Sequence, residues 1–212
     1  MSSGTPTREV PTPLGPARVH RVEPAGPVVG TLVLGHGAGG GVDSADLSAV
    51  AVAAAGAGWR TLLVEQPWKV AGKRIAPAPA RLDEGWTAVL RRLRDDGGLA
   101  GPLVLGGRSA GARVACRTAA GQGAAGVLAL AFPLHPPGRP GKSRAAELCA
   151  VEVPVLVVQG RTDAFGRPAD VTAATAGRPT VTVRAVLGDH SLSRDPAALA
   201  AVVAPWLAGL DH

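Results

Sequence analysis

The chain has 212 residues, enough for one domain to bury a hydrophobic core without disulfide or metal staples. A formal net charge of +6 could point to a nucleic-acid or acidic partner, but the arginines are scattered and no aromatic residues lie between them, so we expect no nucleic-acid binding. Cys116 and Cys149 have neither a metal-ligand spacing nor a disulfide framework, and we expect no metal and no cofactor.

Export and membrane insertion are not indicated by the sequence. Residues 1–16 alternate Thr, Pro and Gly, lack the apolar core of a signal peptide, and predict a flexible tail. The longest uncharged span, residues 118–138, is interrupted by Gln122, several glycines and three prolines, so we do not expect it to cross a bilayer. We therefore expect a cytoplasmic protein without membrane contact, in which residues 17–212 form a single domain.

Apolar runs alternate with helical patterns along the chain. The expected elements are an edge strand at 18–22, a strand at 28–34, a helix from about 44, a strand at 60–64, a helix at 81–94, a strand at 103–105, a helix at 110–120, a strand at 126–131, a short helix at 143–150, a strand at 155–158, a helix at 168–176, a strand at 180–187 and a helix that begins at Pro196 with Asp195 as its N-cap. An irregular basic loop at 65–79 precedes the second of these helices. The alternation predicts an α/β fold, with a mostly parallel sheet of about six to seven strands and helices on both faces.

The stretch from residue 103 to residue 111 carries the most informative motif. An apolar strand leads into Gly107, Ser109 and Gly111, which match Gly-x-Ser-x-Gly, and a helix rich in small residues follows. A strand, a sharp turn with serine at its apex and a helix are the context that a nucleophile elbow requires. The two glycines have no Cβ, so strand and helix can pass each other closely. A glycine-rich turn without chemistry gives the same pattern, so the interpretation depends on partners elsewhere in the chain.

Polar residues collect where the predicted strands end, which is the edge at which ligands bind in such sheets. His36, Ser109, His135, Asp163 and His190 each follow an apolar strand. A serine hydroxyl needs a base to take its proton, and the base needs a third group to orient it. His190 is the natural base and Asp163 the natural orienting acid, and Ser, Asp, His is the chain order of α/β-hydrolases. An Asp in a loop can also be a simple turn residue.

Two other carboxylates are weaker candidates for the orienting acid. Asp189 is adjacent to His190 in sequence and is poorly placed to reach its Nδ1, and Asp170 lies inside a predicted helix. For the oxyanion, we expect donors from the backbone N–H of Ala110, at the start of a helix, and of Ala38, in the glycine-rich loop after the strand at 28–34.

Substrate contacts are expected from the loops around this edge of the sheet. The candidates are His36, Gly37, Trp68, Arg108 and His135. Arg108 and the basic loop at 65–79 suggest a carboxylate or phosphate on the substrate. For two of the candidates a structural role is an open alternative: His36 can instead hold its loop through backbone hydrogen bonds, and His135, between prolines, can instead form a pocket wall.

The motifs above resemble those of the α/β-hydrolases, in particular small lidless enzymes similar to dienelactone hydrolases, over about residues 18–210. The stretches 66–69, 72–74, 106–115, 132–138, 157–160 and 188–192 more narrowly resemble a group of predicted hydrolases that is shared with a subunit of a eukaryotic chromatin-modifying complex. The resemblance implies the triad Ser109, Asp163 and His190 but no particular substrate. The segment 132–154 is too short for a large cap domain, so we expect a shallow, open site.

These observations predict a serine hydrolase that cleaves a small ester or thioester through an acyl-enzyme. The alternative is a catalytically silent protein-interaction module with the same fold, which the resemblance to a chromatin-complex subunit makes reasonable. Replacing the nucleophile distinguishes the two hypotheses. The sequence leaves the oligomeric state open.

Overall fold

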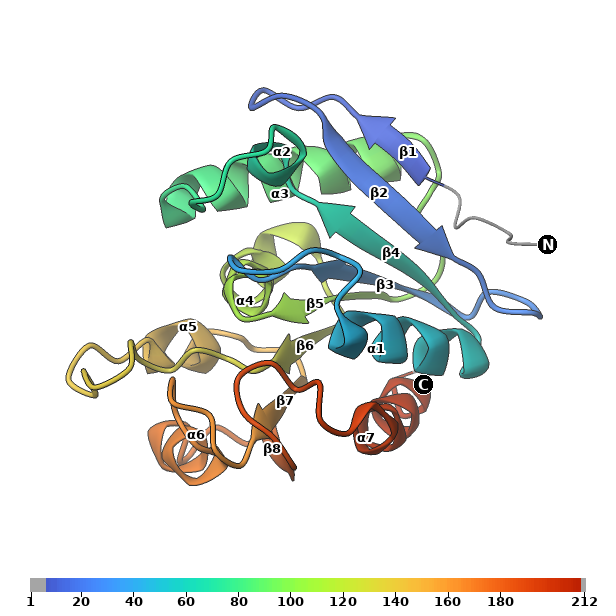
Figure 1. Cartoon of the computed structure of the whole chain (residues 1–212). Helices are drawn as coiled ribbons and strands as arrows, with labels where there is room; N and C mark the ends of the chain where they lie inside the picture. Colours follow the sequence, from blue (N-terminus) through green and yellow to red (C-terminus); the bar gives the residue numbers. More distant parts are fainter. Residues whose placement is uncertain (1–6, 211–212) are drawn as a thin grey trace.

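The computed structural model describes residues 7–210 and forms one mixed sheet flanked by helices (Figure 1). The strands are β1 (Thr7–Val10), β2 (Ala17–Val22), β3 (Gly30–Gly35), β4 (Trp59–Glu65), β5 (Leu103–Arg108), β6 (Gly126–Leu130), β7 (Val155–Gly160) and β8 (Val181–Val186). The helices are α1 (Ala45–Gly56), α2 (Pro67–Val70), α3 (Pro79–Asp95), α4 (Ala110–Gln122), α5 (Ala145–Cys149), α6 (Pro168–Ala174) and α7 (Pro196–Ala208).

Within residues 7–210 the sheet has eight strands in the order β1-β2-β4-β3-β5-β6-β7-β8. The pairs β1–β2 and β2–β4 are antiparallel, and all other neighbours are parallel. The predicted α/β class and mostly parallel sheet are confirmed. Because β3, β5, β6, β7 and β8 run in the same direction, the loops that follow them meet at one edge of the sheet.

The N-terminal part of the prediction is wrong in three respects. Thr7–Val10 pairs with β2 and buries Val10 completely, so the predicted flexible tail does not extend to residue 16; residues 1–6 lie outside the described part. β2 is therefore not the edge strand, and the sheet has one strand more than the six to seven expected. The sequence pattern missed β1 because only one of its four side chains is buried. In the basic loop, Pro67 at the first helical position begins the short helix α2.

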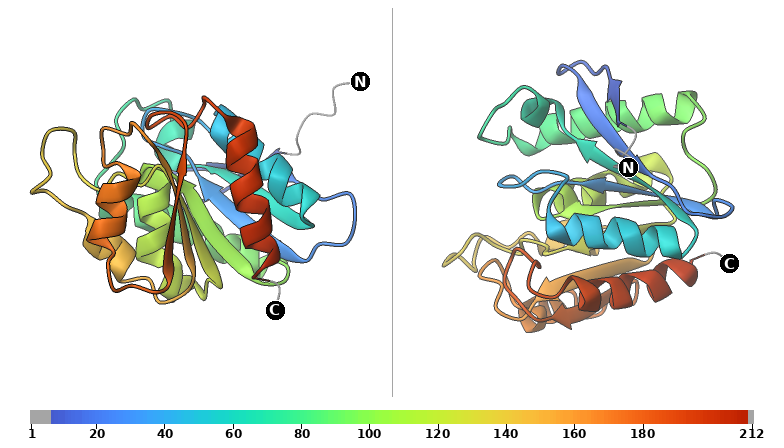
Figure 2. Two further views of the ribbon diagram at one scale, coloured as in Figure 1. Left: turned by 90° about the horizontal axis from the view of Figure 1, so that it is seen from below. Right: turned by 45° about the vertical axis from the view of Figure 1, so that its right-hand side comes forward.

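Helices cover both faces of the sheet (Figure 2). One core contains side chains of α3, α4, α5 and α6, and the other contains those of α1 and α7. The strands supply both cores alternately: Val33 faces the first, whereas Leu32 and Leu34 face the second. Burial on both faces explains why the central strands read as continuous apolar runs. In the segment between β6 and β7, the only helix is the five-residue α5, so no large cap covers the sheet edge.

No helix within residues 7–210 combines the length and the apolar character needed to cross a lipid bilayer.

Candidate active site

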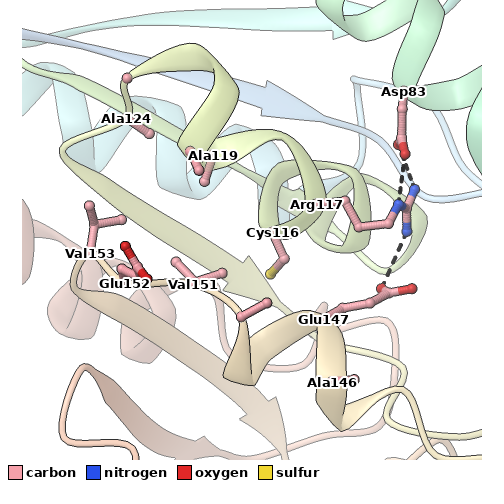
Figure 3. A pocket seen from close by; sticks show the side chains of 13 residues that line it. Asp83, Cys116, Arg117, Ala119, Ala124, Ala146, Glu147, Val151, Glu152 and Val153 are labelled. Atoms are coloured by element: carbon pink, nitrogen blue, oxygen red, sulfur yellow. Dashed lines mark hydrogen bonds and ion pairs between the residues drawn. The ribbon is translucent and has the colours of Figure 1, made fainter.

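One groove lies away from the carboxyl edge of the sheet, between α4, α5 and the segment before β7 (Figure 3). It has a volume of about 870 Å³, but its polar groups satisfy one another. Arg117 donates hydrogen bonds to Asp83 at 2.8 and 2.6 Å and to Glu147 at 3.3 Å. Burial raises the pKa of the Cys116 thiol to about 12, so this cysteine is not a nucleophile at neutral pH. The groove carries no reactive arrangement.

Ser109 lies at the turn between β5 and α4, and its backbone is in the positive-φ region, at φ 53° and ψ −106°. Few residues other than glycine adopt such a conformation, and it lifts the serine out of the sheet edge. The turn packs directly on β3: a Cβ on Gly107 or on Gly111 would lie 2.3 Å from the carbonyl oxygen of Gly35. Glycine at both positions is therefore a steric requirement, and the local geometry is that of the elbow that the motif predicts.

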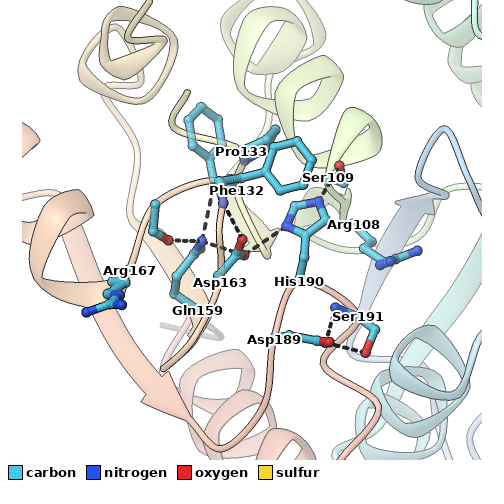
Figure 4. Close-up of polar contacts among 12 residues, drawn as sticks. Arg108, Ser109, Phe132, Pro133, Gln159, Asp163, Arg167, Asp189, His190 and Ser191 are labelled. Atoms are coloured by element: carbon cyan, nitrogen blue, oxygen red, sulfur yellow. Dashed lines mark hydrogen bonds and ion pairs between the residues drawn. The ribbon is translucent and has the colours of Figure 1, made fainter. Parts of the chain in front are cut away.

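The structure brings Ser109, His190 and Asp163 into one hydrogen-bonded row (Figure 4). His190 Nε2 lies 2.9 Å from Ser109 Oγ, and His190 Nδ1 lies 2.8 Å from Asp163 Oδ2. A carboxylate can only accept, so Nδ1 carries the proton and the lone pair of Nε2 faces the serine hydroxyl. The Asp163 side chain is fully buried and that of His190 is 19% exposed. The arrangement can take a proton from Ser109 and return it to a leaving group.

The other two carboxylates have partners of their own. Asp189 Oδ1 accepts hydrogen bonds from the N–H and the hydroxyl of Ser191, which lower the pKa of the Asp189 carboxyl, and Asp170 accepts one from the N–H of Arg167. Neither is bonded to His190. Asp163 is therefore the carboxylate that the fold places against Nδ1 of the histidine.

Two residues that the sequence did not single out complete the surroundings of Asp163 and His190. Phe165 donates its N–H to Asp163 Oδ1 at 2.8 Å, and its ring stacks on the imidazole of His190 with the centroids 4.1 Å apart. Gln159 donates to Asp163 Oδ2 at 2.9 Å. The sequence feature that could have identified Gln159 is a polar side chain at the end of an otherwise apolar strand.

The glycine-rich loop after β3 lies beside the nucleophile. A Cβ on Gly37 would be 3.5 Å from the Cβ of Ser109, and the N–H of Gly40 bonds back to the carbonyl oxygen of Gly37. Ala38 is exposed in this turn, and Ala110 is the first residue of α4. The two candidate oxyanion donors thus belong to segments that flank Ser109.

His36 holds this loop and does not present its ring to a ligand. The side chain is buried, its Nδ1 bonds the carbonyl oxygen of Gly37 at 2.8 Å, and its Nε2 accepts the N–H of Gln66 at 3.2 Å. Burial lowers the pKa of His36, which keeps the ring neutral. Both ring nitrogens are occupied by backbone groups, which supports the structural role that the sequence left open for His36.

Trp68, a second candidate for substrate contact, packs against His36 with the ring centroids 5.5 Å apart. It lines, with Ala110 and Val114, a cavity of about 10 Å³, which is the room of a single water molecule. His135 Nδ1 bonds the carbonyl oxygen of Pro136, and the backbone N–H of His135 donates to the carbonyl oxygen of Phe165. These bonds hold the proline-rich loop next to the Phe165 ring that stacks on His190.

Arg108 is turned toward α1 and the glycine-rich loop. Its Nε lies 3.5 Å from Asp46 Oδ2, and the Asp46 side chain is only 1% exposed. A guanidinium nitrogen, Nη1, lies 3.0 Å from where a Cβ on Gly40 would be. The positive charge of Arg108 is thus compensated by a buried carboxylate beneath the loop, which weakens the prediction that it binds an anionic substrate group.

Within residues 7–210 no cluster of three or more His, Cys, Asp or Glu side chains has the arrangement to hold a metal ion.

Comparisons with known proteins agree with this fold. Residues 29–198 match a family model described as the alpha/beta hydrolase domain, so the chain belongs to the α/β-hydrolase family. No curated protein matches the chain in sequence.

Several solved structures have the same fold over nearly the whole chain. An alpha-beta serine hydrolase homologue from Coxiella burnetii has a TM-score of 0.80 at 20% identity, covering 98% of this chain and 99% of that one. A serine hydrolase without lid from Xanthomonas campestris has a TM-score of 0.76 at 20% identity, covering 96% and 93%. The esterase domain of a Rhodothermus marinus protein has a TM-score of 0.72 at 14% identity, covering 96% and 98%. At these identities the likeness shows the fold alone.

Proposed function

We propose that this protein is a serine hydrolase that cleaves a small ester or thioester through Ser109, His190 and Asp163. The observation that carries the proposal is the row of two hydrogen bonds, 2.9 Å from Ser109 Oγ to His190 Nε2 and 2.8 Å from His190 Nδ1 to Asp163 Oδ2. Such a row is the arrangement in which a serine hydroxyl becomes a nucleophile at neutral pH.

In the first half of the reaction, Ser109 Oγ attacks the acyl carbon while His190 Nε2 takes its proton. The tetrahedral intermediate then collapses, the bond from carbon to the leaving oxygen or sulfur breaks, and His190 gives the proton to the leaving group. In the second half, His190 takes a proton from water, which attacks the acyl-enzyme. Collapse of this second intermediate releases the acid and returns the proton to Ser109.

Two charges develop during each step, and the site has groups for both. We assign the negative charge on the acyl oxygen to the N–H groups of Ala38 and Ala110, which lie in the two segments that flank Ser109. The positive charge on His190 faces the Asp163 carboxylate on one side and the ring of Phe165 on the other.

A small ester or thioester fits the absence of a large cap between β6 and β7. The candidates for substrate contact are Gly37, in the glycine-rich loop beside Ser109, Trp68, in α2, and His135, in the proline-rich loop after β6. The esterase domain from Rhodothermus marinus, which has the same fold, supports an ester as the substrate. The proposed chemistry needs neither a metal nor a cofactor.

The test is the intact mass of the protein after exposure to a fluorophosphonate probe, which reports an activated serine without any choice of substrate. We expect one adduct on the wild type, none on Ser109→Ala, and one on Ser48→Ala, which changes an exposed serine on α1. On an ester that the wild type cleaves, Ser109→Ala should lower kcat/KM by about 10³-fold or more.

A well-folded wild type that takes no adduct would contradict the proposal. The catalytically silent interaction module would then be the better hypothesis, and capture of a partner would replace the search for a substrate. An adduct that persists on Ser109→Ala would show that another nucleophile reacts.

A further inference from the structure

Gln159 is a polar residue in a buried strand whose other side chains are apolar. It lies near the end of β7, where the four preceding residues are Val or Leu, and it is fully buried. Its Nε2 has three acceptors: Gly166 O at 2.8 Å, Asp163 Oδ2 at 2.9 Å and Phe132 O at 3.2 Å (Figure 4). Two of them belong to the loops that follow β6 and β7, and the third is the carboxylate of the proposed triad.

The orientation of this amide is fixed by its surroundings. All three neighbours of Nε2 are acceptors, so turning the amide over would place its oxygen against three other oxygens. In the orientation that fits, Gln159 Oε1 is buried and has no hydrogen-bond partner within the described residues. An unpaired buried acceptor lowers the stability of the fold. The amide orientation that places an N–H donor against Asp163 thus lowers the stability of the fold, because it leaves Oε1 unpaired.

The carboxylate of Asp163 is held by three donors. His190 Nδ1 and Gln159 Nε2 both bond Oδ2, and the N–H of Phe165 bonds Oδ1. The side chain is fully buried, so water does not replace a missing donor. If Gln159 were absent, only the histidine itself would bond Oδ2, and the carboxylate could rotate away from it.

We propose that Gln159 is a positioning residue that fixes the Asp163 carboxylate against Nδ1 of His190 and joins the loops after β6 and β7 around it. This inference rests on the proposed function for its effect on turnover. The effect arises because a carboxylate that keeps its place holds the imidazole in the orientation and tautomer that the serine requires. Small misplacements of a catalytic group reduce turnover strongly.

The first test variant is Gln159→Met, which removes both N–H donors and keeps a similar length. We expect a folded protein whose kcat is about tenfold lower, with KM changed by less than about twofold, because the loss concerns orientation and not substrate binding. The second readout is the downfield proton NMR signal of His190 Nδ1–H, which should broaden or disappear as its bond to Asp163 loosens. An unchanged signal and an unchanged kcat in a folded variant would overturn the proposal.

A matched control is Thr31→Val, which also removes the polar group of a fully buried side chain, here the hydroxyl that bonds the backbone of Ala100 at the opposite end of the sheet. It should lower the melting temperature but leave kcat and the His190 signal as in the wild type. If Thr31→Val changed both readouts as much as Gln159→Met, the effect would be one of stability and the proposal would fail.

Gln159→Glu tests the same idea even if the methionine variant does not fold. The new carboxyl is buried beside Asp163, so its pKa is raised; below that pKa it is protonated and donates to Asp163, and above it the two carboxylates repel each other. The kcat of the folded variant relative to wild type should therefore fall as pH rises. A ratio that stays constant with pH would contradict the proposal.

The NMR signal does not require turnover, so this inference and the proposed function can fail separately. If the wild type neither cleaves esters nor takes a fluorophosphonate, the proposed function is wrong. The comparison of the His190 signal between wild type and Gln159→Met still decides whether Gln159 positions Asp163.

Discussion

The nucleophile turn and the acid–base pair lie side by side but are fixed by different means. At the turn, backbones touch: Gly107 and Gly111 pack on the carbonyl of Gly35, with no room for a Cβ. At the pair, side chains touch: Gln159 and His190 both bond one oxygen of Asp163. The first region depends on the absence of side chains and the second on the presence of particular ones.

This difference separates folding from function. A substitution at the turn forces backbones apart and should act first on stability. A substitution at the pair leaves the backbone in place and should act first on turnover. The two regions are not wholly distinct, because a Cβ on Gly160 would also lie 2.3 Å from the carbonyl oxygen of Asp189 and disturb the loop that carries His190.

The largest expected effect is that of Gly111→Ala at the turn. Its Cβ would lie 2.3 Å from Gly35 O and 2.5 Å from Gly35 C, and neither α4 nor β3 can yield locally. We expect a loss in the free energy of unfolding at or above the upper end of the roughly 1–3 kcal/mol typical of overpacked cores, measured by chemical denaturation. The matched control is Gly121→Ala on the same helix, where an added Cβ meets no atom within 4 Å. It should be neutral or stabilising by about 0.5–1 kcal/mol. Equal effects of the two variants would break the comparison.

The sequence predicts the nucleophile turn far better than the surroundings of the pair. The elbow motif is contiguous, so its spacing alone carries its geometry, and the apolar runs locate β3 to β7 because these strands are largely buried on both faces. The three residues of the proposed triad could be chosen because each follows a predicted strand. These three residues meet at one edge of the sheet because the strands that precede them are parallel.

What the sequence missed depends on contacts between distant segments. β1 has one buried side chain in four and is defined by its pairing with β2, which no local pattern reveals. The contact of Arg108 with Asp46 joins β5 to α1, and sequence reasoning saw in Arg108 only a candidate contact for an anionic substrate group. The role of His36 likewise depends on Gln66, in another segment.

The next largest effect concerns Arg108, whose guanidinium lies between Asp46 and the glycine-rich loop. Arg108→Met leaves the Asp46 carboxylate buried without its partner. Losing one partner of a fully buried pair costs about 3–5 kcal/mol, and partial exposure of Arg108 reduces the expected loss to about 2 kcal/mol. Denaturation of the variant measures this loss. Adding Asp46→Asn should recover part of it, because the buried charge is then gone.

The same variant tests whether Arg108 selects anionic substrates. Because its charge is compensated by Asp46, we expect the preference between a neutral and an anionic ester to be the same in wild type and Arg108→Met. A clear shift toward neutral esters in the variant would show instead that Arg108 contacts a substrate anion.

The smallest effect is a pH dependence at His36, which holds the same loop by hydrogen bonds. Burial is the main cause that lowers the pKa of His36 from 6.5; Lys69 acts in the same direction, whereas the bond to Gly37 and the charge of Glu65 oppose it. Above pH 6.5 the ring is neutral in both the folded and the unfolded chain, so stability is complete there. As pH falls below 6.5 the unfolded chain binds a proton that the folded chain does not, and stability decreases. Each unit by which the pKa of His36 is lowered contributes about 1.4 kcal/mol to the unfolding free energy.

His36→Gln keeps an acceptor for the Gln66 N–H and cannot titrate, so its unfolding free energy should fall less steeply below pH 6.5 than that of the wild type. Parallel curves of unfolding free energy against pH for the two proteins would show that His36 is protonated in the folded state as readily as in the unfolded chain. The neutral form of His36 would then not stabilise the loop.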